Sequence, residues 1–292
     1  MVVALSHVPL CEPHHPGPAL MGTVDVEYRG EVVIVTLDRR DAMNTLNVDL
    51  VRDLTAVLDE LHEDRNCRVV ILTGAGGAFC AGLDLRGYGD EAATGDDASP
   101  GGDGVMIAAF ERQQDIAGLA RRIHGLRQPV IAAVNGAAAG GGLALVCASD
   151  IRIGSRDSVY AVGFIRAGFS ACDIGVSWLL PRLVGTGRAH ELMLTGRKFS
   201  AQEALAYGLL VDVVEPSDLM SAAIATADEI LANPPLSVEL TKVGMWAAVE
   251  SNSFAATVEF ENRQQMITAM TADRSEATAA FLEKRRPEYR RR

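Results

Sequence analysis

Three consecutive glycines, Gly140 to Gly142, lie where the backbone could hold a negatively charged atom. They follow the apolar, strand-like run 130–134 and precede the run 143–147, which has the composition of a buried helix. A helix that begins after such a turn has N–H groups without partners at its N-terminus, where the helix dipole favours negative charge. Because glycine has no Cβ, a ligand can approach this backbone closely.

A second loop of the same character, 73–85, comes directly after another strand-like run, 68–72. If the two strand–loop–helix junctions met, each could donate one N–H to a single oxygen. Two backbone donors on one oxygen form an oxyanion hole, which indicates acyl chemistry because negative charge develops on a carbonyl oxygen there. The alternative reading is that the glycines serve only close packing of a helix on a strand.

The composition excludes several other classes of protein. The 292 residues carry a net charge of −11, which argues against a nucleic-acid groove. The apolar runs are shorter than a membrane span, so no membrane-spanning segment is expected. The five cysteines are scattered and odd in number, which indicates reduced thiols in a cytoplasmic protein, and no spacing of Cys or His predicts a metal site.

Elements along the chain predict an α/β fold. Strand-like runs at 24–28 and 32–37 predict a hairpin, and Asn47 is a candidate N-cap for a helix to about residue 63. Further strand–helix units are followed by a helical tail. We expect a disordered extension over 1–21, which is rich in proline, then a core over 22–205 and a mainly helical region over 206–292.

Several segments, in this order along the chain, resemble those of the crotonase (enoyl-CoA hydratase/isomerase) superfamily. The loop 78–85 and the loop 129–142 match the two glycine-rich loops of that family. The remaining matches are 148–152, 194–197, 204–210 and 280–285. The resemblance covers about residues 22–289.

The resemblance implies a crotonase-like spiral of ββα units with a C-terminal helical region that packs trimers, often paired into hexamers. It implies an acyl-CoA thioester as substrate, so that coenzyme A arrives as part of the substrate and no separate cofactor is expected. The implied activity is of the enoyl-CoA hydratase/isomerase type, in fatty-acid or other lipid metabolism.

The same resemblance assigns candidate site residues. The family's oxyanion hole uses the N–H of the residue before the Asp of the first loop and that of the middle glycine of the second, which are Leu83 and Gly141 here. Asp84 itself is expected to anchor the backbone rather than to react. Residues expected near the substrate, including one near the coenzyme A adenine and one that could reach a phosphate, are Ala42, Ala81, Gly82, Asp84, Gly140, Phe164 and Lys284.

The chain departs from the family at the two glutamates that handle water and the proton in hydratases. Ala144 and Phe164 occupy their positions, and neither side chain can accept a proton. Asp173 remains as a carboxylate twelve positions before Gly185, a distance at which some isomerases and dehalogenases of the family carry a functional aspartate. The alternative role for Asp173 is to cap a helix that begins near Val176.

Three functions follow from these residues. The first is an enoyl-CoA hydratase or isomerase that uses the Leu83 and Gly141 amides. The second is an isomerase or hydrolase-like relative in which Asp173 is the only carboxylate. The third is a non-catalytic acyl-CoA-binding protein that kept the fold and lost both glutamates.

Overall fold

The structure, a computed structural model, describes residues 19–86 and 103–291. Residues 1–18 of the predicted extension lie outside this range. The last part of that extension, Ala19–Met21, forms strand β1, which pairs antiparallel with β2 (Val24–Arg29). Strand β1 thus lies before residue 22, where we expected the core to start, and the domain bounds stay a prediction.

A seven-stranded sheet forms the centre of the molecule, in the order β1-β2-β3-β4-β6-β8-β11. The predicted hairpin is confirmed as β2 and β3, and every pairing from β3 to β11 is parallel. The strands after β1 are β2 (Val24–Arg29), β3 (Val32–Leu37), β4 (Val69–Gly74), β6 (Val130–Val134), β8 (Ile151–Ser155) and β11 (Asp212–Val214).

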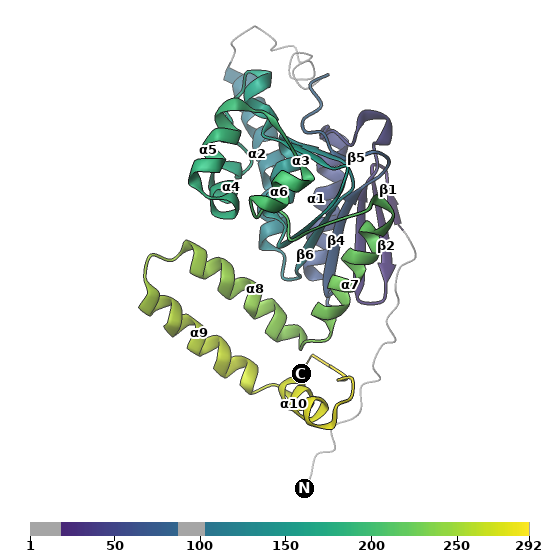
Figure 1. Cartoon of the computed structure of the whole chain (residues 1–292), viewed down its shortest axis with the longest axis vertical. Helices are drawn as coiled ribbons and strands as arrows, with labels where there is room; N and C mark the ends of the chain where they lie inside the picture. Colours follow the sequence, from purple (N-terminus) through teal and green to yellow (C-terminus); the bar gives the residue numbers. More distant parts are fainter. Residues whose placement is uncertain (1–18, 87–102, 292) are drawn as a thin grey trace.

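Alternate residues of these strands face opposite sides of the sheet, and both sides are covered (Figure 1). One side packs on α1 (Val48–Glu63), α2 (Asp103–Gly125) and α3 (Gly141–Ala148). The other packs on α7 (Leu219–Leu231), through Leu219, Ala223 and Ala227. The predicted cap of α1 is confirmed, since the Asn47 side chain accepts a hydrogen bond from the Leu50 amide.

A second sheet of four strands, in the order β10-β9-β7-β5, lies beside α3. Its strands have three residues each: β5 (Ala78–Cys80), β7 (Ala137–Ala139), β9 (Val159–Ala161) and β10 (Lys198–Ser200). The expectation that the first loop leads directly into a helix is therefore wrong, because Ala78–Cys80 pairs with β7 instead. These strands are too short and too rich in alanine to show a period of two.

The rest of the described chain after β9 is mainly helical and includes the C-terminal helices that we expected. The helices are α4 (Val176–Val184), α5 (Thr186–Thr195), α6 (Ala201–Ala206), α8 (Pro235–Glu250), α9 (Phe254–Ala269) and α10 (Ala272–Glu283). Figure 1 shows α8, α9 and α10 reaching away from the sheets. Over residues 19–86 and 103–291, no helix combines the length and apolarity needed to cross a membrane. The predicted fold class, α/β with C-terminal helices, is confirmed.

Candidate active site

The two glycine-rich loops touch each other through glycine backbone. A Cβ placed on Gly82 would stand 2.9 Å from the carbonyl oxygen of Ala139 and 3.7 Å from the Cα of Gly140. Gly82 and Gly140 have φ angles of +102° and +51°, which side chains other than hydrogen rarely allow. The loops that the sequence places about 60 residues apart are thus brought together, as predicted.

The backbone pattern around Leu83 leaves its amide without an acceptor in the part of the chain that the structure describes. Leu46 donates to the Gly82 oxygen at 2.7 Å and accepts from the Asp84 amide at 3.0 Å, which makes an isolated parallel bridge opposite Leu83. The N–H of Leu83 itself therefore points to the side away from Leu46. Within the described residues it donates to no backbone or side-chain oxygen.

The amide of Gly141 also lacks an acceptor among the described residues, but for a different reason. Gly141 is the first residue of α3, where an N–H has no partner within the helix. No acceptor from the described part of the chain binds it. Both candidate donors are thus unengaged by residues 19–86 and 103–291.

The packing role proposed for the glycines applies to some of them and not to others. A Cβ on Gly136 or Gly142 would stand 2.1 Å from the Gly77 oxygen or 1.9 Å from the Cys80 oxygen, so these two glycines allow backbone to pack on backbone. A Cβ on Gly141 would instead meet side-chain tips, Leu46 Cδ1 at 2.7 Å and Ile174 Cδ1 at 3.4 Å. Close packing of backbone on backbone therefore does not explain why position 141 is a glycine.

Asp84 is anchored inside the protein. One carboxylate oxygen accepts from Arg39 at 3.0 Å and from the Thr45 hydroxyl at 3.3 Å, and the other accepts from the Arg86 amide at 3.2 Å. Burial acts to raise the pKa of Asp84, but the donors, with Arg39 foremost, hold it below its ordinary value. This geometry fits the predicted anchoring role, since it fixes the residue next to the Leu83 amide.

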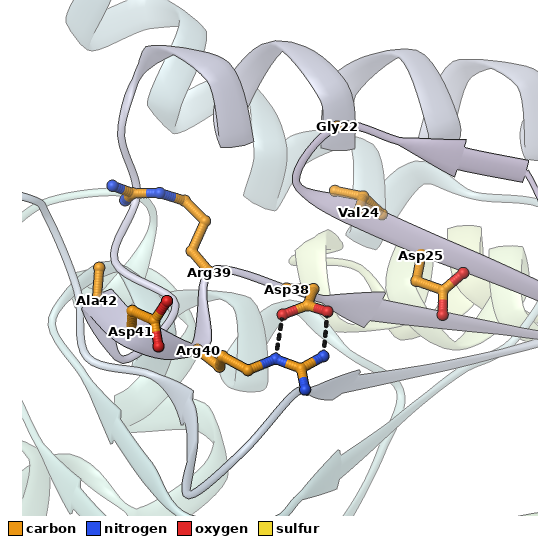
Figure 2. Close-up of a pocket in the computed structure, with 8 residues that line it drawn as sticks. All are labelled: Gly22, Val24, Asp25, Asp38, Arg39, Arg40, Asp41 and Ala42. Atoms are coloured by element: carbon orange, nitrogen blue, oxygen red, sulfur yellow. Dashed lines mark hydrogen bonds and ion pairs between the residues drawn. The ribbon is translucent and has the colours of Figure 1, made fainter.

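Ala42 lies at the edge of a pocket of about 380 Å³ beside the end of β3 (Figure 2). Three carboxylates and two guanidinium groups line this pocket, and a hydrogen bond from Arg40 lowers the pKa of Asp38. The guanidinium of Arg39 is engaged with Asp84. The charge of the pocket thus gives no support for a phosphate there, and the contact of Ala42 with coenzyme A stays a prediction.

The two hydratase positions lie at the second loop and are apolar. The ring of Phe164 comes to 3.5 Å from the place of a Cβ on Gly140, and the amide of the buried Ala144 donates to the Gly140 oxygen at 3.0 Å. Cys80 and Cys147 lie close by, and burial raises the pKa of both thiols to about 12. None of these four side chains can carry a proton to or from a substrate near neutral pH.

Asp173 is the carboxylate that the fold brings to this region. Its neighbour Ile174 lies against Gly141, and its oxygen Oδ1 accepts from Gln113 of α2 at 2.6 Å and from the Ile174 amide at 2.8 Å. Its side chain does not cap α4, whose N-cap is Gly175. The capping alternative is therefore not supported, whereas the contact with Gln113 was missed from the sequence.

Within a single chain, Lys284 does not lie near the two glycine-rich loops. It ends α10, which lies at the opposite end of the molecule from β5 and α3 (Figure 1). Its contact with a phosphate remains a prediction. Of the described residues, no group of three or more His, Cys, Asp or Glu side chains is placed to hold a metal ion.

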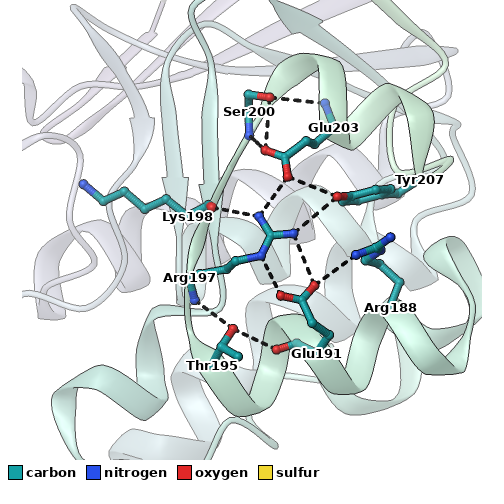
Figure 3. A network of polar contacts seen from close by, with 8 residues as sticks. All are labelled: Arg188, Glu191, Thr195, Arg197, Lys198, Ser200, Glu203 and Tyr207. Atoms are coloured by element: carbon teal, nitrogen blue, oxygen red, sulfur yellow. Dashed lines mark hydrogen bonds and ion pairs between the residues drawn. The ribbon is translucent and has the colours of Figure 1, made fainter.

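The family-like segment 194–197 serves structure rather than the site. The guanidinium of Arg197 binds Glu191, Glu203 and the Tyr207 hydroxyl, and so ties α5, β10 and α6 together (Figure 3). Ser200 and Glu203 form a capping box at the start of α6. This network supports the second sheet at its β10 edge.

Comparisons with known proteins agree with these features. Residues 27–292 match the sequence model of the family described as enoyl-CoA hydratase/isomerase. The chain is 37% identical over 262 residues to "Probable enoyl-CoA hydratase echA12" of Mycobacterium bovis, covering 89% of this chain and 90% of that protein. It is 34% identical over 259 residues to the 1,2-epoxyphenylacetyl-CoA isomerase of Escherichia coli, covering 88% and 94%. The crystal structure of an enoyl-CoA hydratase from Bacillus anthracis superposes with a TM-score of 0.84 at 35% identity, covering 92% and 100%.

Proposed function

Because this chain belongs to the enoyl-CoA hydratase/isomerase family and is an enzyme of that type, we propose that it stabilises the enolate of an acyl-CoA thioester with the amides of Leu83 and Gly141. The observation that supports this most is the contact between the two loops at Gly82 and Gly140, next to two amides that the described protein leaves unengaged. The relatives named above are enzymes by name, so the non-catalytic alternative is not favoured.

The two amides would supply most of the stabilisation. Removal of a proton next to a thioester carbonyl moves an electron pair toward the carbonyl oxygen, and one preorganised donor on that oxygen contributes about 3 kcal/mol to the transition state. Backbone amides suit this task because they do not titrate. They are also held rigidly, Leu83 by its anchored neighbour Asp84 and Gly141 by α3.

We propose isomerisation as the reaction, with Asp173 as the only acid–base group. Its oxygen Oδ2, which no donor among the described residues binds, would take a proton from the acyl chain, and the enolate would form. Asp173 would return the proton at another carbon, so that the double bond moves and no atom is gained or lost. Hydration needs a further group to activate water, and the two family positions for such groups are Ala144 and Phe164. One relative at 34% identity is named as an isomerase.

A panel of enoyl-, dienoyl- and hydroxyacyl-CoA substrates with a mass readout tests this proposal. We expect a product of unchanged mass with a shifted double bond. Asp173→Asn should lower kcat by at least about 100-fold, the usual loss for a general base. Asp157→Asn, which removes an exposed carboxylate between β8 and β9, is the matched control and should leave kcat unchanged.

Two results would overturn the proposal of isomerisation by Asp173. A product that gains the mass of one water would assign hydration, and normal turnover by Asp173→Asn would remove the acid–base role. Loss of activity in Asp157→Asn as well would show that any lost carboxylate has the same effect.

We also propose that the chain assembles as a homotrimer, or as a hexamer of paired trimers. Helices α8 to α10 and the turn between α9 and α10 expose large apolar side chains, among them Phe254 at 86%, Met270 at 84% and Phe281 at 83% of their full area. Exposed apolar groups of this size are typical of a surface that a partner covers. Sedimentation equilibrium should give three or six times the mass of one chain, and a monomer at micromolar concentration would contradict the proposal.

We further propose that the enzyme works in fatty-acid or related lipid metabolism, in the cytoplasm. The support is limited to the substrate class implied by the family and to four free cysteines among the described residues. Accumulation of an unsaturated acyl-CoA in cells that lack the protein would test the pathway.

A further inference from the structure

A polar residue stands at the N-terminal end of the buried stripe of α2. Ile116, Ala120 and Ile123 recur at helical spacing and are almost completely buried. Gln113 continues this stripe one turn toward the N-terminus of the helix, at a position where an apolar side chain would be the usual choice. Its amide group is directed at a carboxylate instead.

Among the described residues, donors hold the carboxylate of Asp173 through one of its two oxygens. Its oxygen Oδ1 accepts from Gln113 Nε2 at 2.6 Å and from the backbone amide of Ile174 at 2.8 Å. No donor from residues 19–86 or 103–291 binds the other oxygen, Oδ2. Two donors on one oxygen fix the plane of the carboxyl group and leave the second oxygen accessible to a ligand.

The turn after Asp173 fixes its distance from the second loop. Ile174 has a φ of +47°, which is unusual for a β-branched residue, and its Cδ1 lies 3.4 Å from the place of a Cβ on Gly141. Residues held in such sparsely populated conformations cluster at functional sites. Gln113 and Ile174 thus hold Asp173 from two different elements, α2 and the turn before α4.

We propose that Gln113 is a positioning residue, which holds Asp173 through Oδ1 so that Oδ2 faces the reacting carbon. This inference rests on the proposed function, because it needs Asp173 as the acid–base group. Gln113 itself does not touch the substrate. Its effect on the reaction is transmitted entirely by the carboxylate that it orients.

Gln113→Leu removes the donor and keeps most of the volume. We expect kcat to fall about 10- to 100-fold, the cost of a catalytic group misplaced by about 1 Å, while KM changes less than about twofold. Gln114→Leu is the matched control, since Gln114 is the next residue of α2 and is exposed. It should leave both constants unchanged.

A double variant separates positioning from a merely structural role. If Gln113 acts only through Asp173, Gln113→Leu should change the residual kcat of Asp173→Asn by less than about twofold, because coupled groups are not additive. A structural role would lower kcat by the same factor in both backgrounds. That result would overturn the inference.

The outcomes distinguish this inference from the function on which it rests. Normal turnover by Asp173→Asn would reject the proposed function, whereas an inactive Asp173→Asn with a fully active Gln113→Leu would reject only the role of Gln113. If Gln113→Leu does not fold, Gln113→Glu gives a second test of similar volume. It places a second carboxyl beside Asp173, the two would share one proton, and kcat should fall with KM preserved. Native kcat in Gln113→Glu would reject the inference.

Discussion

Gly82→Ala tests whether the contact between the two loops matters for the reaction. At a φ of +102° a side chain is strained, and the new Cβ would stand 2.9 Å from the Ala139 oxygen, about half an ångström too close. Ala139 belongs to β7 and is paired with β9, so it cannot yield without breaking the second sheet. The first loop, which carries the Leu83 amide, is therefore the part that should move.

The expected size of the effect follows from this geometry. The strained backbone should reduce the free energy of unfolding by about 1–3 kcal/mol. For a chain of this size, each of these kcal/mol corresponds to a fall of about 2–4 °C in Tm. Displacing one oxyanion donor should lower kcat about 100- to 1000-fold, which is far more than the stability change alone would produce.

Steady-state kinetics on the acyl-CoA substrate found in the panel, together with thermal unfolding, check both numbers. Gly77→Ala is the matched control in the same loop, because a Cβ on Gly77 meets no atom within 4 Å and its φ is not positive. A folded Gly82→Ala enzyme with kcat within about threefold of the native value would refute the role of the loop contact. An equal loss in Gly77→Ala would show that the loop tolerates no substitution at all.

Two further predictions concern stability. The Ser200 amide and the Arg197 guanidinium lower the pKa of Glu203 to about 2. The stabilisation of the folded state by the ionised Glu203 is therefore complete above the ordinary pKa of 4.5 and is lost as the pH falls toward 2. The difference in unfolding free energy between the native protein and Glu203→Gln, measured in urea, should therefore shrink over that pH range, and a constant difference would contradict the assignment. Lys242 lies buried 2.7 Å from Asp150, and burial lowers its pKa. Lys242→Met should cost about 3 kcal/mol, the low end for a broken buried ion pair, because the partly buried Asp150 loses its cation but keeps hydrogen bonds from the Val130 amide and the Trp246 indole. The double variant with Asp150→Asn should recover part of this cost, and no recovery would mean that the ion pair is not the cause.

The parts of the site that were predictable from the sequence are those made by the backbone. A run of glycines after a strand restricts what the chain can do there, so the two loops and the start of α3 follow from local residue types. The anchoring of Asp84 is only partly of this kind: its bond from the Arg86 amide lies within one tight turn, whereas its bonds from Arg39 and Thr45 come from a distant segment.

The parts that were not predictable depend on contacts between distant segments. Gln113 and Asp173 lie 60 residues apart, and nothing near either one indicates the other. The strands of the second sheet are defined by their partners, not by their own sequence, because three residues such as Ala137–Ala139 carry no period. The left-handed turn at Ile174 is likewise imposed by packing, since isoleucine does not favour it.

The position of α7 has a consequence for how the protein is made. The face of the sheet formed by Ile34, Ile71 and Ile131 is complete once β6 has been synthesised, yet the helix that shields it ends only at Leu231. While about a hundred further codons are translated, this apolar face of the nascent chain would stay exposed to solvent. The nascent chain should therefore need a chaperone on the ribosome, and chains that are truncated before α7 should aggregate.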